Sequence, residues 1–219
     1  VGAVGKDWNG FNILHTGAAR VGGLDIGFVP DKNGSATAEI MKNMELTILL
    51  GADELKMASV GGFVVYIGTH GDNGAHRADV ILPASTYTEK SGIYVNTEGR
   101  VQMANRAAFA PGEAKEDWSI IRALSAVLGK PLLFNSLAQL RESLFSEFPH
   151  LLELDAVAKG DIGEVLALAK KTGRLNIAEL KSPVKDFYLT NPIARASKVM
   201  AQCSAQAKGR DTKIRQAAE

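Results

Sequence analysis

Cysteine is almost absent from this sequence: Cys203 is the single one among 219 residues. Iron–sulfur clusters and cysteine-rich zinc sites each need a set of several thiolates, so the chain cannot hold either kind of centre by itself. No disulfide can form within the chain, which is typical of a reducing compartment such as the cytosol or the mitochondrial matrix. We expect Cys203 to be a small buried apolar residue on a terminal helix rather than a reactive thiol.

The sequence also lacks an excess of charge and a long hydrophobic run. Lys and Arg number 25 against 24 Asp and Glu, a net charge of +1. This balance gives no electrostatic basis for binding nucleic acid or an anionic membrane surface. No apolar run reaches the roughly 20 residues of a spanning helix, so we expect no direct membrane insertion. Nothing near Val1 resembles a signal or transit peptide, and we expect the segment to follow a cleavage or to belong to a longer polypeptide.

What the sequence does contain is a set of short strand-like segments. Three apolar runs, each closed by glycine or proline, predict strands: Leu46–Leu50, Phe63–Ile67 and Ala78–Leu82. A fourth segment, Ile93–Asn96, alternates apolar and polar residues and predicts a hairpin at the sheet edge. The pattern is typical of an α/β fold with a mostly parallel open sheet flanked by helices and a helical C-terminal extension.

Helical periodicity and capping residues predict the helices. Two come before the first predicted strand. One is at residues 6–19 and ends before Gly22-Gly23, and the other is at residues 36–42. Two more are expected to cover the sheet, one at 115–128 and one that begins at the Ser136–Gln139 capping box and ends at Pro149. Later helices begin at Asp161 and at Asn191-Pro192, the last running through Cys203. We divide the chain into an α/β domain at 1–154, a helical extension at 155–204 and a polar tail at 205–219.

Candidate binding residues lie where the strands end. Gly51 could admit a phosphate, and Asp53 could cap a helix or hold a ribose hydroxyl. The pattern Gly-x-Gly-x-x-Gly is absent, however, and Gly61-Gly62 precedes a strand instead of following one. We therefore favour a strand-end turn and helix cap over a nucleotide or pterin site.

The loop from Gly68 to Arg77 contains His70, Asp72, His76 and Arg77. Two histidines and an aspartate suggest a metal site, but no His-x-x-x-His or His-x-x-Glu-His spacing is present, so we expect no metal there. A polar surface or interface loop is the favoured interpretation, and a relict pocket the second.

Catalytic chemistry has no clear candidate. Ser85 and Ser91 lack the Gly-x-Ser-x-Gly elbow of a nucleophilic serine. The hairpin residues Glu89, Asn96, Glu98 and Arg100 could help to fix a pterin, but Asn96–Gly99 has good turn chemistry, and we favour turn formation and charge pairing at an exposed edge. No residue receives a catalytic role.

Several longer strings resemble a known family. ADVILPASTYTEKSGIYVNTEGRVQ (78–102) is similar to the strand-and-loop signature of the molybdopterin oxidoreductase superfamily. Together with LLGAD (49–53) and EDWSIIRALS (116–125), it resembles one branch, the large iron–sulfur subunits of respiratory complex I (NADH:ubiquinone oxidoreductase). KDFYLTNPIARASKVMAQC (185–203) resembles the C-terminal signature of that branch in mitochondria and their bacterial relatives. The likeness extends over roughly residues 12–204.

This resemblance implies a degenerate pterin-type domain with a structural, non-redox role in a complex that passes electrons from NADH to ubiquinone and pumps protons. The 2Fe–2S and 4Fe–4S clusters are expected in the N-terminal part of the full subunit, with no cofactor in this segment. Expected partners are that cluster-bearing domain and other peripheral-arm subunits. The expected location is the matrix side of the mitochondrial inner membrane, or the cytoplasmic face of the bacterial one.

Two alternatives remain. The chain could be an active molybdopterin-dependent oxidoreductase fragment that uses the loops after Leu50 and Ile67, with a serine or aspartate in place of a cysteine as metal ligand. It could also be a free-standing α/β interaction module from a split gene.

Overall fold

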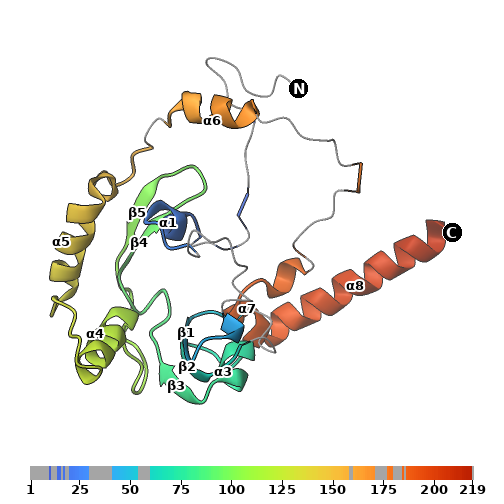
Figure 1. Cartoon of the computed structure of the whole chain (residues 1–219). Coiled ribbons are helices and arrows are strands. Elements are labelled where there is room, and N and C mark those ends of the chain that lie inside the picture. Colours follow the sequence, from blue (N-terminus) through green and yellow to red (C-terminus); the bar gives the residue numbers. More distant parts are fainter. Residues whose placement is uncertain are drawn as a thin grey trace.

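A computed structural model gives the arrangement of the chain (Figure 1). The structure describes residues 10, 14, 15, 17, 20–29, 41–53, 60–157, 160–170, 177–179, 184 and 186–218, of which 168, 169 and the last eight are described by their backbone alone. The helix predicted at 36–42 falls mostly outside this part of the chain, as does most of the helix predicted at 6–19.

A three-stranded parallel sheet lies at the centre of the α/β region. Its strands are β1 (Leu46–Leu50), β2 (Phe63–Gly68) and β3 (Val80–Pro83), in the order β1-β2-β3. The predicted parallel α/β fold is thus confirmed, with strand limits within two residues of those expected. β2 is the middle strand, and four of its six residues are buried.

Helices pack on both faces of this sheet. On one face, Leu49, Val64 and Tyr66 form a buried cluster with Met41, Val60 and Ala75. On the other, Ile120 and Ile121 of α4 (Asp117–Val127) pack against a cluster that contains Val65 and Ile67. The prediction that this helix covers the sheet is confirmed.

The glycine-rich segment after β2 is more ordered than predicted. It was expected to be a loop, but Asn73–Arg77 form a short helix, α3. The Asp72 carboxylate accepts a hydrogen bond from the Asn73 N–H at 2.9 Å and caps the helix. Gly74 and Ala75 are buried against the sheet, so tertiary packing decides a conformation that the local sequence leaves open.

The hairpin is separate from the parallel sheet. β4 (Gly92–Val95) and β5 (Val101–Ala104) pair with each other in an antiparallel sheet of two strands, so the expected edge position is wrong. The predicted turn is confirmed: Gly99 has φ +85°, and the Asn96 side-chain oxygen accepts hydrogen bonds from the N–H groups of Glu98 and Arg100.

The hairpin has its own hydrophobic core. Val95, Val101 and Leu151 are buried there, and they contact residues of α5 (Leu137–Glu147) and α1 (Arg20–Asp25). α5 therefore covers the hairpin and not the parallel sheet, as Figure 1 also shows. Leu151 belongs to the short 3-10 helix η2 (Pro149–Leu152).

α1 corrects a further expectation, because it runs through Gly22-Gly23 instead of ending before them. A Cβ atom on Gly22 would lie 3.7 Å from the Val95 backbone nitrogen. This is an ordinary van der Waals distance. The helix packs on the hairpin through Val21, a distant contact that helix propensity does not include.

The C-terminal extension contains α6 (Ile162–Ala169), the 3-10 helix η3 (Phe187–Leu189), α7 (Pro192–Ala196) and α8 (Lys198–Ala218). The predicted cap is confirmed, since the Asn191 side chain accepts a hydrogen bond from the Ala194 N–H. A single helix ending at Cys203 is wrong: Ser197 is extended and separates α7 from α8, which continues through the expected tail and projects from the body in Figure 1. None of the described helices is long and apolar enough to cross a membrane.

Replacing Ser136 by alanine is expected to lower the free energy of unfolding by about 1 kcal/mol, because the serine hydroxyl caps α5 by accepting a hydrogen bond from the Gln139 N–H at 3.2 Å. The other half of the expected capping box differs: the Gln139 side chain accepts from the Asn135 N–H at 2.6 Å and not from the cap residue. Urea unfolding of Ser136→Ala beside Ser143→Ala, a serine inside the same helix, tests the value. Equal losses would contradict a capping role.

Candidate functional site

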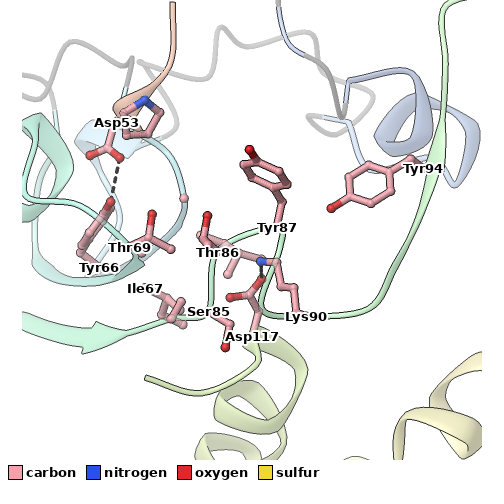
Figure 2. A pocket seen from close by; sticks show the side chains of 15 residues that line it. Asp53, Tyr66, Ile67, Thr69, Ser85, Thr86, Tyr87, Lys90, Tyr94 and Asp117 are labelled. Atoms are coloured by element: carbon pink, nitrogen blue, oxygen red, sulfur yellow. Dashed lines mark hydrogen bonds and ion pairs between the residues drawn. The ribbon is translucent and has the colours of Figure 1, made fainter. Parts of the chain in front are cut away.

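A cavity of about 230 Å³ opens at the carboxyl ends of β1, β2 and β3 (Figure 2). This is where ligands bind in open parallel α/β sheets. Residues that follow each of the three strands line it, together with residues from the hairpin segment, the start of α4 and the start of α7. They include Gly51, Asp53, Thr69, Ser85, Thr86, Tyr87, Lys90, Tyr94, Asp117 and Pro192.

The sequence offers four candidates for a relict pocket: Gly51, Asp53, His70 and Asp72. The first two line this cavity. Gly51 turns the chain at the end of β1 with φ +60°, and its N–H donates to the Ile67 carbonyl at 2.8 Å. The Asp53 carboxylate is only 1% exposed and accepts a hydrogen bond from the Tyr66 hydroxyl at 2.7 Å, drawn in Figure 2. Its other oxygen accepts from the Gly74 N–H at 3.1 Å, which ties α3 to the end of β1.

Tyr66 reaches this carboxylate by lying along β2 over Gly68. A Cβ atom on Gly68 would lie 2.1 Å from the Tyr66 hydroxyl oxygen, so the glycine leaves room for the ring. The same hydroxyl lies 3.1 Å from the His70 carbonyl. Burial, together with the hydrogen bond to Asp53, holds the pKa of Tyr66 well above its ordinary value. The phenol therefore stays protonated and acts as a donor.

His70 and Asp72, the other two candidates, are not among the residues that line the cavity. His70 contacts the Thr69 hydroxyl through Nδ1 at 2.8 Å. Asp72 caps α3 and forms an ion pair with Arg195 of α7, so the C-terminal extension is fastened to the helix that follows β2. Burial alone would raise the pKa of Asp72, but the hydrogen bonds from Arg195 and the Asn73 N–H hold it below its ordinary value.

Two further features of the cavity were missed from the sequence. The Lys90 ammonium forms an ion pair with the Asp117 carboxylate, which joins the hairpin segment to α4. Ser85 is 1% exposed, and its hydroxyl has no hydrogen-bond partner among the described residues. Lys90 and Ser85 lie within the quoted family signature. Their positions in the cavity, which Asp117 and Pro192 also line, could be known only from the folded chain.

The lining residues do not fit a molybdenum pterin. The one thiolate that the chain could offer, Cys203, lies on α8 and is not part of the lining. The volume is below the roughly 300–1,000 Å³ that is usual for ligand pockets. The cation among the lining residues, Lys90, is already paired with Asp117. Over the described residues, no group of three or more His, Cys, Asp or Glu side chains could hold a metal ion.

The hairpin residues have structural contacts of their own. Glu89 accepts a hydrogen bond from the Thr86 N–H at 3.0 Å, and Arg100 pairs with Glu98 at 2.8 Å. None of the four hairpin candidates is among the residues that line the cavity. These contacts match the expected turn formation and charge pairing.

Replacing Arg195 by alanine is expected to lower the free energy of unfolding by about 1–2 kcal/mol at pH 7, because it removes a largely buried charge-assisted hydrogen bond to Asp72. A carboxylate with a depressed pKa stabilises the fold above its unfolded pKa, and this contribution disappears as the pH falls through the folded value. The difference between variant and wild type should therefore shrink below about pH 4.

Urea unfolding at pH 7 and pH 3 measures this difference. Lys208→Ala is the control, since that ammonium pairs with Asp186 at 2.9 Å but is 67% exposed, and its loss should be below about 0.5 kcal/mol. A difference for Arg195→Ala that is the same at both pH values would contradict the proposed role of the ion pair.

Comparison with known proteins gives two family matches. A model described as molybdopterin oxidoreductase matches residues 1–127. A second model, which describes the C-terminal region of an NADH-ubiquinone oxidoreductase subunit, matches residues 153–203. The cavity lies mainly within the first match, and Pro192 and Arg195 belong to the second.

Curated relatives share most of this chain. The NADH-ubiquinone oxidoreductase 75 kDa subunit of Reclinomonas americana is 48% identical over 201 residues, which cover 91% of this chain and 29% of that protein. The mitochondrial NADH dehydrogenase (ubiquinone) iron-sulfur protein 1 of Solanum tuberosum is 41% identical over 92% of this chain and 27% of its own length. The mitochondrial NADH-ubiquinone oxidoreductase 78 kDa subunit of Neurospora crassa is 42% identical over 94% and 28%. The chain thus spans less than a third of these relatives.

Proposed function

Since the chain belongs to the molybdopterin oxidoreductase family and also matches the C-terminal region of an NADH-ubiquinone oxidoreductase subunit, we propose that it is a structural part of the large iron–sulfur subunit of complex I. In this role it supports the cluster-bearing part of that subunit and presents surface to neighbouring subunits. The complex as a whole passes electrons from NADH to ubiquinone, coupled to proton pumping, while these residues hold no redox centre.

The observation that carries this proposal is the position of the C-terminal region at the end of the parallel sheet. Pro192, the first residue of α7, lines the cavity where an enzyme of the family would bind its cofactor. Three residues later, Arg195 pairs with Asp72 at the start of α3. A segment typical of the NADH-ubiquinone oxidoreductase branch therefore lies against the cavity and closes part of it, which supports a structural use of the old binding end.

The cysteine content also supports a structural role for these residues, with the redox centres elsewhere in the subunit. A single cysteine cannot ligate an iron–sulfur cluster, so electrons must pass through thiolates outside these 219 residues. We place the 2Fe–2S and 4Fe–4S clusters in the preceding part of the large subunit. Partners are then that part and other peripheral-arm subunits, on the matrix side of the mitochondrial inner membrane or on the cytoplasmic face of a bacterial one.

Native electrophoresis of solubilised membranes tests the proposal. The chain is detected with an antibody, and the same lane is stained for NADH oxidation. Co-migration with a very large NADH-oxidising band is the expected result. A small species that is absent from membranes would overturn it.

The two alternatives give other outcomes of the same experiment. A small species that contains molybdenum or tungsten and a pterin, measured by metal analysis and fluorescence, would identify an active oxidoreductase. A small species without either would identify an independent interaction module. The intact mass of the chain in the large band, compared with 23.3 kDa, tells whether these residues are separately encoded.

A further inference from the structure

The two faces of the parallel sheet are covered very differently. In the register of the strands, Leu46 pairs with Phe63, and Ile48 pairs with Val65, which pairs with Val80. Paired residues of parallel strands point to the same side, so these side chains share one face with Leu50. We call the exposed side chains of this face the open sheet face; they are Leu46, Ile48, Leu50, Phe63 and Val80, with buried Val65 between Ile48 and Val80.

α4 covers only the neighbouring part of that face. Its residues Ile120 and Ile121 pack with Val65, Ile67 and Leu82. The five side chains of the open sheet face remain 38–49% exposed. On the opposite face of the sheet, Leu49, Val64 and Tyr66 are at most 2% exposed. The described residues therefore leave these five apolar side chains partly uncovered. The opposite face is buried over β1 and β2 and is exposed at Ile81 of β3 (54%).

The adjoining sheet edge has no partner strand among the described residues either. β1 is the terminal strand in the order β1-β2-β3, and no described strand pairs with its outer edge. Its sequence, Leu-Thr-Ile-Leu-Leu, contains none of the lysines or prolines that protect a solvent-exposed edge. Parallel strands are normally buried on both faces, so edge and face together require a covering element.

We propose that the open sheet face and the outer edge of β1 are covered by further strands, with their helix, from the part of the large subunit that precedes this region. This inference rests on the proposed function. The relatives are more than three times as long as the matched segment, and residues 153–203 match a C-terminal model, so the remainder of a relative lies before it.

The handedness of strand crossovers specifies the order that the preceding strands must have to cover the open sheet face. α3 connects β2 to β3 and packs on the buried face, because Ala75 belongs to the cluster of Leu49 and Val64. Crossovers between parallel strands are right-handed, so strands that progress outward from β1, in the opposite direction, place their helices on the other face. That other face is the open sheet face. Its leucine, isoleucine and phenylalanine side chains suit contact with the apolar stripe of a crossover helix.

Photo-crosslinking in the native complex identifies the occupant. Phe63→p-benzoylphenylalanine replaces one aromatic side chain by another on the middle strand of the sheet. The complex that contains this variant is irradiated in solubilised membranes. Mass spectrometry is expected to find crosslinked peptides from the preceding part of the large subunit. Peptides from a second copy of this chain or from another subunit, or no crosslinked peptide, would overturn the inference. Phe109→p-benzoylphenylalanine, on an aromatic residue that is 82% exposed between β5 and α4, should not yield the same peptides.

A pair of substitutions gives a second, independent measurement. Ile48→Lys places a charge at the centre of the open sheet face and is expected to lower the assembled NADH-oxidising band at least fivefold, whereas Ile48→Val should leave it unchanged. Equal band intensity for the two variants would overturn this inference and leave the proposed function intact. Absence of the wild-type chain from that band would instead refute the proposed function, and this inference with it.

Discussion

Replacing Asp53 by alanine is expected to lower the free energy of unfolding by about 3 kcal/mol. The carboxylate is 1% exposed and accepts two hydrogen bonds, from the Tyr66 hydroxyl and from the Gly74 N–H. Alanine leaves the Gly74 donor without its partner inside the protein and detaches α3 from the end of β1. For a chain of about this size, the loss corresponds to a fall in Tm of about 6–12 °C.

A double-mutant cycle checks that this effect passes through Tyr66. Tyr66→Phe alone should cost about 1 kcal/mol, because it removes only one of the two hydrogen bonds. The double variant should be about as stable as Asp53→Ala alone, since both changes remove the same interaction. If the losses in free energy of unfolding for the two single variants simply add in the double variant, direct coupling is contradicted. A loss below about 0.5 kcal/mol for Asp53→Ala would contradict the anchoring role itself.

Replacing Gly62 by alanine is expected to lower the free energy of unfolding by about 4 kcal/mol or more. The residue has φ +68°, and a Cβ atom there would lie 2.2 Å from the Met44 carbonyl oxygen and 2.5 Å from that of Glu45. These are backbone atoms. The Glu45 carbonyl is held in place by a hydrogen bond from the Phe63 N–H at 2.8 Å, so it cannot move away without breaking the start of the sheet.

Gly99 provides a matched control. It also has a positive φ, +85°, but no atom lies within 4 Å of the Cβ position. Gly99→Ala should therefore cost only the conformational term of about 1 kcal/mol. Urea unfolding of the two variants separates strain from steric clash. Equal losses would show that the close approach of the chain at Gly62 contributes nothing.

The elements with strong local signals were predicted well. The three parallel strands are short apolar runs that end at glycine or proline, and Asn191-Pro192 and Ser136 begin helices as their capping chemistry requires. Errors arose where a distant contact decides the conformation. α3 forms with Gly74 bound to Asp53 and Ala75 packed on the sheet, and α1 passes through Gly22 with Val21 packed on the hairpin.

In the candidate site too, residues with a local sequence signal could be predicted, and residues that depend on a distant contact could not. Gly51 and Asp53 could be selected because they follow a strand, and strand ends meet at the binding edge of a parallel sheet. Tyr66, Lys90 and Arg195 could not be selected. Each acquires its role from a partner 13 to 123 residues away in the sequence, and that distance is closed only in the folded chain.

The sequence by itself determined the family, the parallel α/β class and the lack of the thiolates that an iron–sulfur cluster needs, because these depend on residue types and their order. Only the tertiary structure decided that α7 lies against the cavity at the strand ends, that the hairpin forms a sheet of its own, and that one face of the parallel sheet is partly exposed. These features depend on which apolar surfaces pack together across long separations, and a local pattern of residues does not encode that choice.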